Sequence, residues 1–94
     1  MGFSEAKKAV INALRNGNFM HATRESIEIK NELATGVVTP DEVAKIIKGC
    51  RGFNHSTSPL HGAPHILVHI FKKNEWYIKF YFIDETTMFI SVHK

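Results

Sequence analysis

The apolar residues near the start of the chain recur at the spacing of a helix that is buried on one side. Residues 4–16 predict such a helix, with Ser4 as its N-cap and Gly17 as the residue that ends it. Its apolar stripe consists of Ala6, Ala9, Val10, Ala13 and Leu14. This stripe is expected to pack against a core.

Two more segments in the first half of the chain have helical features. Residues 19–35 place Ile29 and Leu33 four residues apart, which predicts a second helix. The run Thr39-Pro40-Asp41-Glu42 has the pattern of a capping box with proline at the first helical position. It predicts a third helix that ends at Gly49 and buries one apolar side, formed by Val43, Ile46 and Ile47.

The second half of the chain changes to strand-like runs. Residues 49–63 show no periodicity and predict a long loop, whereas residues 64–72, 76–83 and 87–93 are rich in β-branched and aromatic residues. Because strands follow helices without alternating with them, the order predicts one α+β domain over residues 1–94. In it, two or three N-terminal helices pack on one face of a C-terminal antiparallel meander of three or four strands.

Alternation assigns the strand residues to two faces. One face is expected to lie under the helices and comprises Ile66, Val68, Ile70, Trp76, Ile78, Phe80, Phe82, Met88, Ile90 and Val92. The other comprises His65, Leu67, His69, Phe71, Tyr77, Lys79, Tyr81, Phe89, Ser91 and His93. With three-residue turns at 73–75 and 84–86, His69 and Ser91 flank Lys79.

This second face suggests nucleic-acid binding. Aromatic rings on a sheet stack on unpaired bases, lysine neutralises phosphate, and a neutral histidine accepts a proton from a ribose 2′-OH. The alternative is an ordinary solvated sheet face, stabilised by cross-strand aromatic pairs. RNA contacts are expected from Arg51, Phe71, Tyr77, Tyr81, Phe89, Ser91, His21 and Arg24.

Charge and composition agree with a polyanionic partner. Twelve Lys and Arg against nine Asp and Glu give a net charge of +3, and there are six histidines. The single cysteine, Cys50, excludes an internal disulfide. No apolar run is long enough to span a bilayer and no signal-peptide pattern is present, so a cytoplasmic protein that does not act at a membrane is expected.

Histidines supply the candidate chemistry. His55, His61 and His65 are spaced by six and four residues, which would allow a zinc site but matches no metal-site signature. As metal-independent acids and bases they need only a cation such as Arg51 or Lys79 at the phosphate. The candidate catalytic residues are His55, His61, His65, His69, Lys79 and His93. His21 and Arg24, three residues apart, would share one helix face beside a phosphate. No cofactor is expected.

The chain resembles a known group of proteins. Short helices carrying His21-Ala22 and residues 39–43, followed by a basic meander that ends in residues 89–93, resemble the small ribonuclease toxins of bacterial toxin–antitoxin operons, of the RelE-like and BrnT-like kinds. The resemblance implies helices on one side of an antiparallel sheet and metal-independent RNA cleavage. Lys79, Tyr81 and His93 match the pattern by strand position and residue type.

The sequence therefore predicts a toxin-type endoribonuclease of single-stranded RNA. One histidine would activate the 2′-OH, Lys79 would hold the phosphate, and another histidine would protonate the leaving oxygen, giving a 2′,3′-cyclic phosphate. The alternatives are a non-catalytic RNA-binding module and a small inhibitory protein-binding domain. The expected protein partner is an acidic antitoxin, and the free protein is expected to be a monomer or a weak homodimer.

Overall fold

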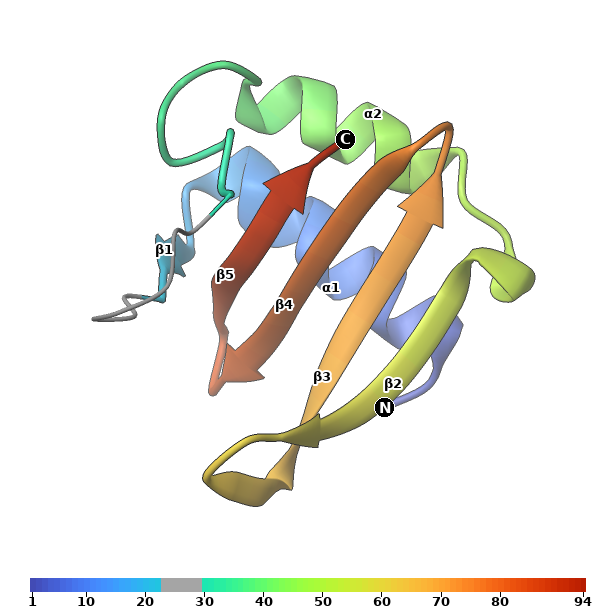
Figure 1. Ribbon diagram of the computed structural model, residues 1–94, viewed down its shortest axis with the longest axis vertical. Helices are drawn as coiled ribbons and strands as arrows, with labels where there is room; N and C mark the ends of the chain where they lie inside the picture. Colours follow the sequence, from blue (N-terminus) through green and yellow to red (C-terminus); the bar gives the residue numbers. More distant parts are fainter. Residues whose placement is uncertain (23–29) are drawn as a thin grey trace.

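A computed structural model describes residues 1–22 and 30–94 (Figure 1). Two helices lie behind a five-stranded mixed sheet, whose front face is not covered by either helix (Figure 1). The elements are, in order, α1 (Phe3–Asn16), β1 (Phe19–His21), α2 (Pro40–Lys48), the 3-10 helix η1 (Gly52–Asn54), β2 (His55–Leu60), β3 (Ala63–Lys73), β4 (Trp76–Ile83) and β5 (Thr86–His93). The predicted α+β class is confirmed, and the predicted number of strands is too small.

The first helix, α1, forms where the apolar stripe predicted it. It buries Ala6, Val10, Ala13 and Leu14, and it ends at Gly17, whose φ of 76° lies in the left-handed region that favours glycine. The predicted N-cap is wrong: the N-cap is Gly2, two residues before the expected Ser4, and no side chain caps the helix.

The second helix, α2, confirms the predicted capping box. Thr39 Oγ1 accepts a hydrogen bond from Glu42 N at 3.1 Å, and Glu42 Oε1 accepts one from Thr39 N at 3.1 Å. Two backbone donors of the first turn are thereby satisfied, and Pro40 needs none. The helix buries Val43, Ala44 and Ile47 against the sheet and α1.

The sheet has the strand order β1-β5-β4-β3-β2. Strands β2 to β5 are antiparallel neighbours, whereas β1 is parallel to β5. The core lies between the sheet and the helices, where Phe71, Ile78, Phe80, Phe89 and Val92 are fully buried. Within residues 1–22 and 30–94, no helix is long and apolar enough to cross a membrane.

The helix predicted over residues 19–35 is wrong within the described part of the chain. Phe19–His21 is strand β1, and Ala22 N donates to Phe89 O in continuation of the pairing. Further on, Asn31 forms an isolated bridge with Val92. Phe19–His21 and Asn31 therefore both pair with the same edge of β5, and this backbone pairing takes the place of the predicted helix.

The long loop predicted over residues 49–63 is also wrong. It contains η1 and the strand β2, which pairs with β3 from His55 opposite Phe71 to Leu60 opposite Ala63. The β2 sequence HSTSPL has neither apolar alternation nor β-branched enrichment, and its Pro59 suits an edge strand. Its pairing with β3 is what makes it a strand.

The predicted face of β3 is inverted. The turn between β3 and β4 has only two residues, Asn74 and Glu75, with φ values of 51° and 71°, instead of the expected three. The pairing is therefore shifted by one residue: Ile70 lies opposite Lys79, where His69 was expected, and His69 lies opposite Phe80. A one-residue change of register moves a whole strand to the other face.

In β5 the predicted faces hold at one end only. A register shift beside Lys79 and Phe80 leaves Ile90 as an extra residue between Phe89, opposite Phe80, and Ser91, opposite Lys79. Ser91, Val92 and His93 keep their expected faces, whereas Phe89 joins the core and Met88 lies opposite Tyr81 on the uncovered face.

Candidate nucleic-acid interface

The uncovered face of the sheet gathers polar and aromatic side chains from three neighbouring strands. Strand β4 contributes alternate residues, and its partners on β3 and β5 lie directly opposite them. We call this set the open face; it consists of Lys72, Tyr77, Lys79, Tyr81, Ser91 and His93. The predicted placement of its β4 and β5 members is confirmed. The sequence did not predict Lys72 on this face, because a three-residue turn was expected between β3 and β4 and the turn has two residues.

The open face is organised around Tyr77. The His93 ring stacks on Tyr77 with centroids 5.3 Å apart at 25°, and Lys72 Nζ lies 5.6 Å from the Tyr77 centroid. Lys72 and His93 are the cross-strand neighbours of Tyr77 on its two sides. The three groups therefore present one ammonium and two aromatic rings in a row across the sheet.

His93 has a defined tautomer when neutral. Its Nδ1 lies 3.1 Å from the backbone carbonyl oxygen of Lys94, which can only accept, so Nδ1 carries the proton. The other ring nitrogen, Nε2, is then left with a lone pair. His93 is therefore able to accept a hydrogen bond or a proton at Nε2.

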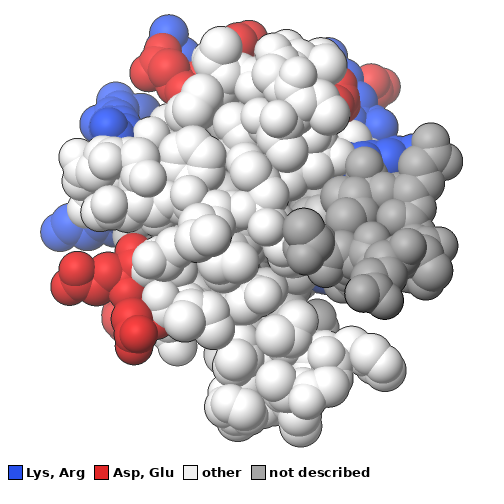
Figure 2. Space-filling model, turned by 90° about the vertical axis from the view of Figure 1, so that its left-hand side faces the viewer, with Lys and Arg blue, Asp and Glu red and all other residues white. Residues whose placement is uncertain are grey.

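The sheet carries positive charge and no negative charge. No Asp or Glu occurs in any of the five strands, which contain Lys72, Lys73 and Lys79. The acidic residues nearest in sequence to β3, β4 and β5 lie in the turns between them, Glu75 in one and Asp84 and Glu85 in the other. The side of the molecule at β1 and β5 has no such concentration of positive charge. There, Lys, Arg, Asp and Glu lie at the margins, and the visible middle has no charged residue (Figure 2). An anion is thus favoured on the open face.

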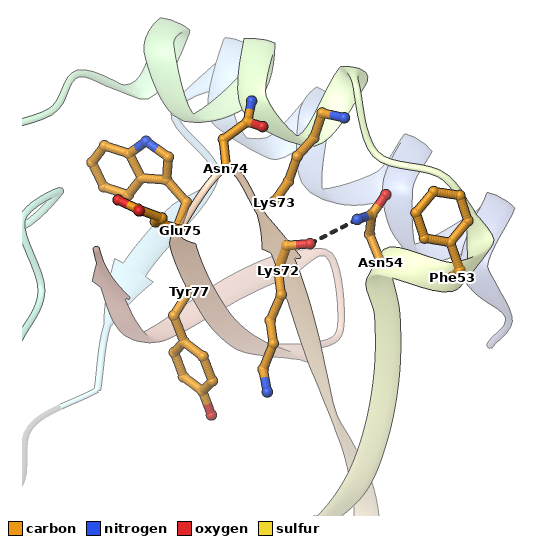
Figure 3. A pocket seen from close by; sticks show the side chains of 8 residues that line it. Phe53, Asn54, Lys72, Lys73, Asn74, Glu75 and Tyr77 are labelled. Atoms are coloured by element: carbon orange, nitrogen blue, oxygen red, sulfur yellow. Dashed lines mark hydrogen bonds between the residues drawn. The ribbon is translucent and has the colours of Figure 1, made fainter.

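A pocket of about 500 Å³ lies at one end of the open face, around the turn between β3 and β4 (Figure 3). It is lined by Phe53, Asn54, Lys72, Lys73, Asn74, Glu75, Trp76 and Tyr77. Lys72 and Tyr77 belong to both the pocket and the open face. The pocket is therefore an extension of the same surface.

His69 does not lie on the open face, contrary to the sequence-based expectation. It is 2 % exposed on the helix side, where its ring stacks on Phe80. Its Nδ1 lies 3.0 Å from His55 Nε2, and the two rings stack with centroids 5.2 Å apart. Burial is the main cause that lowers the pKa of His69 to about 4, with the charges of the neighbouring His55 and the N-terminal ammonium acting in the same direction. Burial also lowers the pKa of His55.

Two aromatic residues predicted to stack on bases are in the core instead. Phe71 and Phe89 are 0 % exposed, and both pack on Phe80. A ring that is enclosed by other side chains cannot stack on a base, so their assignment to RNA binding is wrong.

His21 is held in the structure by a buried amide. Asn31 Oδ1 accepts from Ala34 N at 3.0 Å, so its Nδ2 is the group that donates to His21 Nδ1 at 2.9 Å. Asn31 is 4 % exposed, and burial lowers the pKa of His21. The predicted partner Arg24 lies outside the described residues, so the structure does not bear on that pair.

The remaining candidates are separated from the open face. His61 and His65 are exposed near the connection of β2 and β3, and Arg51 is exposed before η1. Over residues 1–22 and 30–94, no three His, Cys, Asp or Glu side chains are grouped so that they could hold a metal ion. The zinc alternative for His55, His61 and His65 therefore finds no geometric support there.

Comparison of the chain with protein-family models, with curated proteins and with solved structures found no match in any of the three. The resemblance to toxin ribonucleases thus stays a prediction. The function has to be inferred from the open face itself, from the pocket beside it and from the charge they carry.

Proposed function

We propose that the open face binds single-stranded RNA. The observation that carries this proposal is the composition of the sheet: lysines and aromatic rings stand side by side on its uncovered face, and none of its strands contains an acidic residue. Anionic ligands are favoured by the charge, and flat ligands by the rings. Single-stranded RNA combines both properties.

Each part of the open face has a chemical counterpart in RNA. Lys72 and Lys79 lie on adjacent strands and would contact phosphates. Tyr81 and His93 offer rings to unstacked bases, and Ser91 offers a hydroxyl that can donate to or accept from a base or a 2′-OH.

The arrangement of the histidines favours binding over the two-histidine cleavage mechanism. His55 and His69 are bonded to each other on the helix side, and His61 and His65 lie near the hairpin between β2 and β3. Of the candidate catalytic histidines, only His93 lies on the open face, opposite Tyr77 and on the strand next to that of Lys79. An acid and a base working on one phosphodiester must both reach it.

Cleavage by a single histidine is the second candidate, and the free Nε2 of His93 is the observation that favours it. In this mechanism Nε2 takes the proton of a ribose 2′-OH, the oxygen attacks phosphorus, and the 5′-oxygen leaves with a proton from water. Lys79 would stabilise the charge on the phosphorane. The product would be a 2′,3′-cyclic phosphate, and the resembled toxins would imply an acidic antitoxin that covers the open face.

Binding is tested by the salt dependence of affinity. Fluorescence anisotropy of a labelled single-stranded oligouridylate gives Kd at several salt concentrations, for the wild type, for Lys79→Ala and for the matched control Lys45→Ala on α2. Losing one phosphate contact should lower the slope of log K against log salt by about 0.7 in Lys79→Ala. Lys45, which pairs with Asp41 on α2, carries the same charge as Lys79 but lies outside the open face, so Lys45→Ala should leave the slope unchanged. No binding at low salt, or equal slopes for both variants, would contradict the proposal.

Cleavage is tested on the same RNA in EDTA. A cyclic phosphate end formed by the wild type and lost in His93→Ala, with unchanged Kd, would support the second candidate. Binding without any turnover would leave the protein as an RNA-binding module. Growth arrest on expression, relieved by an acidic protein, would separately support the expected antitoxin.

A further inference from the structure

The most exposed aromatic residue of the described chain is Phe53. It is 87 % exposed, whereas the other large exposed hydrophobic residues, including Val37 and Leu67, are 69 % and 42 % exposed. Exposure of a phenylalanine ring to water is unfavourable, and exposed aromatic rings are common in binding surfaces, where a partner covers them. The Phe53 ring is therefore accessible to a ligand.

The turn that carries Phe53 is firmly attached to the sheet. Asn54 Nδ2 donates to the backbone carbonyl oxygen of Lys72 at 2.8 Å (Figure 3). Asn54 Oδ1 accepts from Arg51 N at 2.7 Å. Asn54 N also donates to Arg51 O at 2.9 Å. Since the backbone on both sides of Phe53 is fixed, a ligand that contacts the ring does not have to order the turn as well.

Phe53 forms one wall of the pocket at the β3–β4 turn. On the opposite side Tyr77 and Lys72 point along the open face, so the pocket and that face are continuous (Figure 3). The volume, about 500 Å³, falls within the range of ~300–1,000 Å³ that holds small organic ligands. The lining combines aromatic rings with two lysines and a single carboxylate, Glu75.

We propose that this pocket binds one nucleotide of the RNA strand that crosses the open face, with its base stacked on Phe53 and its phosphate beside Lys72. The inference rests on the proposed function and extends it from a flat surface to a defined base site. Because Lys72 and Tyr77 belong to both the pocket and the open face, an RNA strand bound on the open face can extend directly into the pocket. The excess of lysine over glutamate favours a nucleotide over an acidic peptide side chain.

The chain contains its own reporter for this site. Its only tryptophan, Trp76, lines the pocket, so tryptophan fluorescence reports occupation of the pocket directly. Titration of the wild type with oligouridylate should change the Trp76 emission with the same Kd as the anisotropy. The change should persist at saturation in Lys79→Ala, which weakens binding elsewhere on the face.

The decisive variant is Phe53→Ala. Because the side chain is exposed, folding should be unaffected, and the loss of one stacked base should raise Kd by about five- to a hundredfold and remove the emission change. Phe53→Tyr keeps an aromatic surface and should restore both. Val37→Ala is the matched control, since it truncates another exposed apolar residue outside the pocket.

Three results would overturn the inference in distinguishable ways. Unchanged Kd and emission response in Phe53→Ala, with RNA bound by the wild type, would remove the base site and leave the proposed function standing. Absence of RNA binding by the wild type would remove both. Concentration-dependent self-association that Phe53→Ala abolishes without changing Kd would assign the ring to a contact between two copies of the chain.

Discussion

Mild acid should destabilise this protein through the buried His69. In the unfolded chain a histidine takes up a proton below its ordinary pKa of 6.5, whereas burial beside His55 lowers the pKa of His69 in the fold to about 4. Between these two values the unfolded state binds more protons, so the stability present above pH 6.5 is lost as pH falls toward 4. His55 and His21, whose pKa values are also lowered, act in the same direction.

The size of the effect follows from the difference between the two pKa values. Each pH unit corresponds to ~1.4 kcal/mol, so His69 contributes roughly 3 kcal/mol in total and about 2 kcal/mol of loss between pH 7 and pH 5. A domain of this size has ~5–15 kcal/mol of stability, so the loss is easily measured.

Urea unfolding of the wild type, His69→Leu and His65→Ala at pH 7, 6 and 5 tests this reasoning. His69→Leu should lose about 2 kcal/mol less than the wild type over this range, whatever its stability at pH 7. His65→Ala removes an exposed histidine and should keep the wild-type dependence. If His69→Leu and the wild type lose stability equally, His69 is not held neutral by burial and the description of the His55–His69 pair is refuted.

Three further outcomes are expected. Thr39→Ala removes the capping box of α2 and should lower the free energy of unfolding by about 1 kcal/mol, measured in urea, without changing RNA affinity. Phe80→Ala empties the centre of the core and should cost about 3–5 kcal/mol, whereas Ile83→Ala, at a residue 43 % exposed, should cost far less in the same assay. Glu75→Gln removes the only carboxylate of the pocket and should strengthen RNA binding by roughly two- to fivefold in anisotropy, most strongly at low salt.

Local signals predicted the elements that depend on local interactions. The capping box at Thr39 and the apolar stripe ending at Gly17 fix the two helices through contacts within a few residues. Apolar and polar residues alternate along β4, which lies between β5 and β3, and this alternation predicted correctly which of its residues face the helices. The open-face positions of Tyr77, Lys79 and Tyr81 follow from that alternation alone.

Strand pairings between segments far apart in the chain could not be predicted from such local signals. Strand β1 has three residues and is stabilised by β5, and β2 has no apolar pattern of its own. The face of β3 depends on whether Lys73 belongs to the turn or to the strand, and the sequence Lys73-Asn74-Glu75 lacks the Asn-Gly pair that would mark a two-residue turn. That single residue decides whether His69 or Lys72 reaches the open face.

The most direct test of RNA binding by the open face is methyl NMR during titration with oligouridylate. Ile70 and Met88 lie on the uncovered side of the sheet, next to the open-face residues Lys79 and Tyr81, whereas Ile47 of α2 and Ile78 of β4 are buried in the core. Binding on the open face should shift the methyl signals of Ile70 and Met88 at RNA concentrations that match the anisotropy Kd, and leave those of Ile47 and Ile78 nearly unchanged. Shifts confined to the helix side, or no shifts at saturating RNA, would contradict the account.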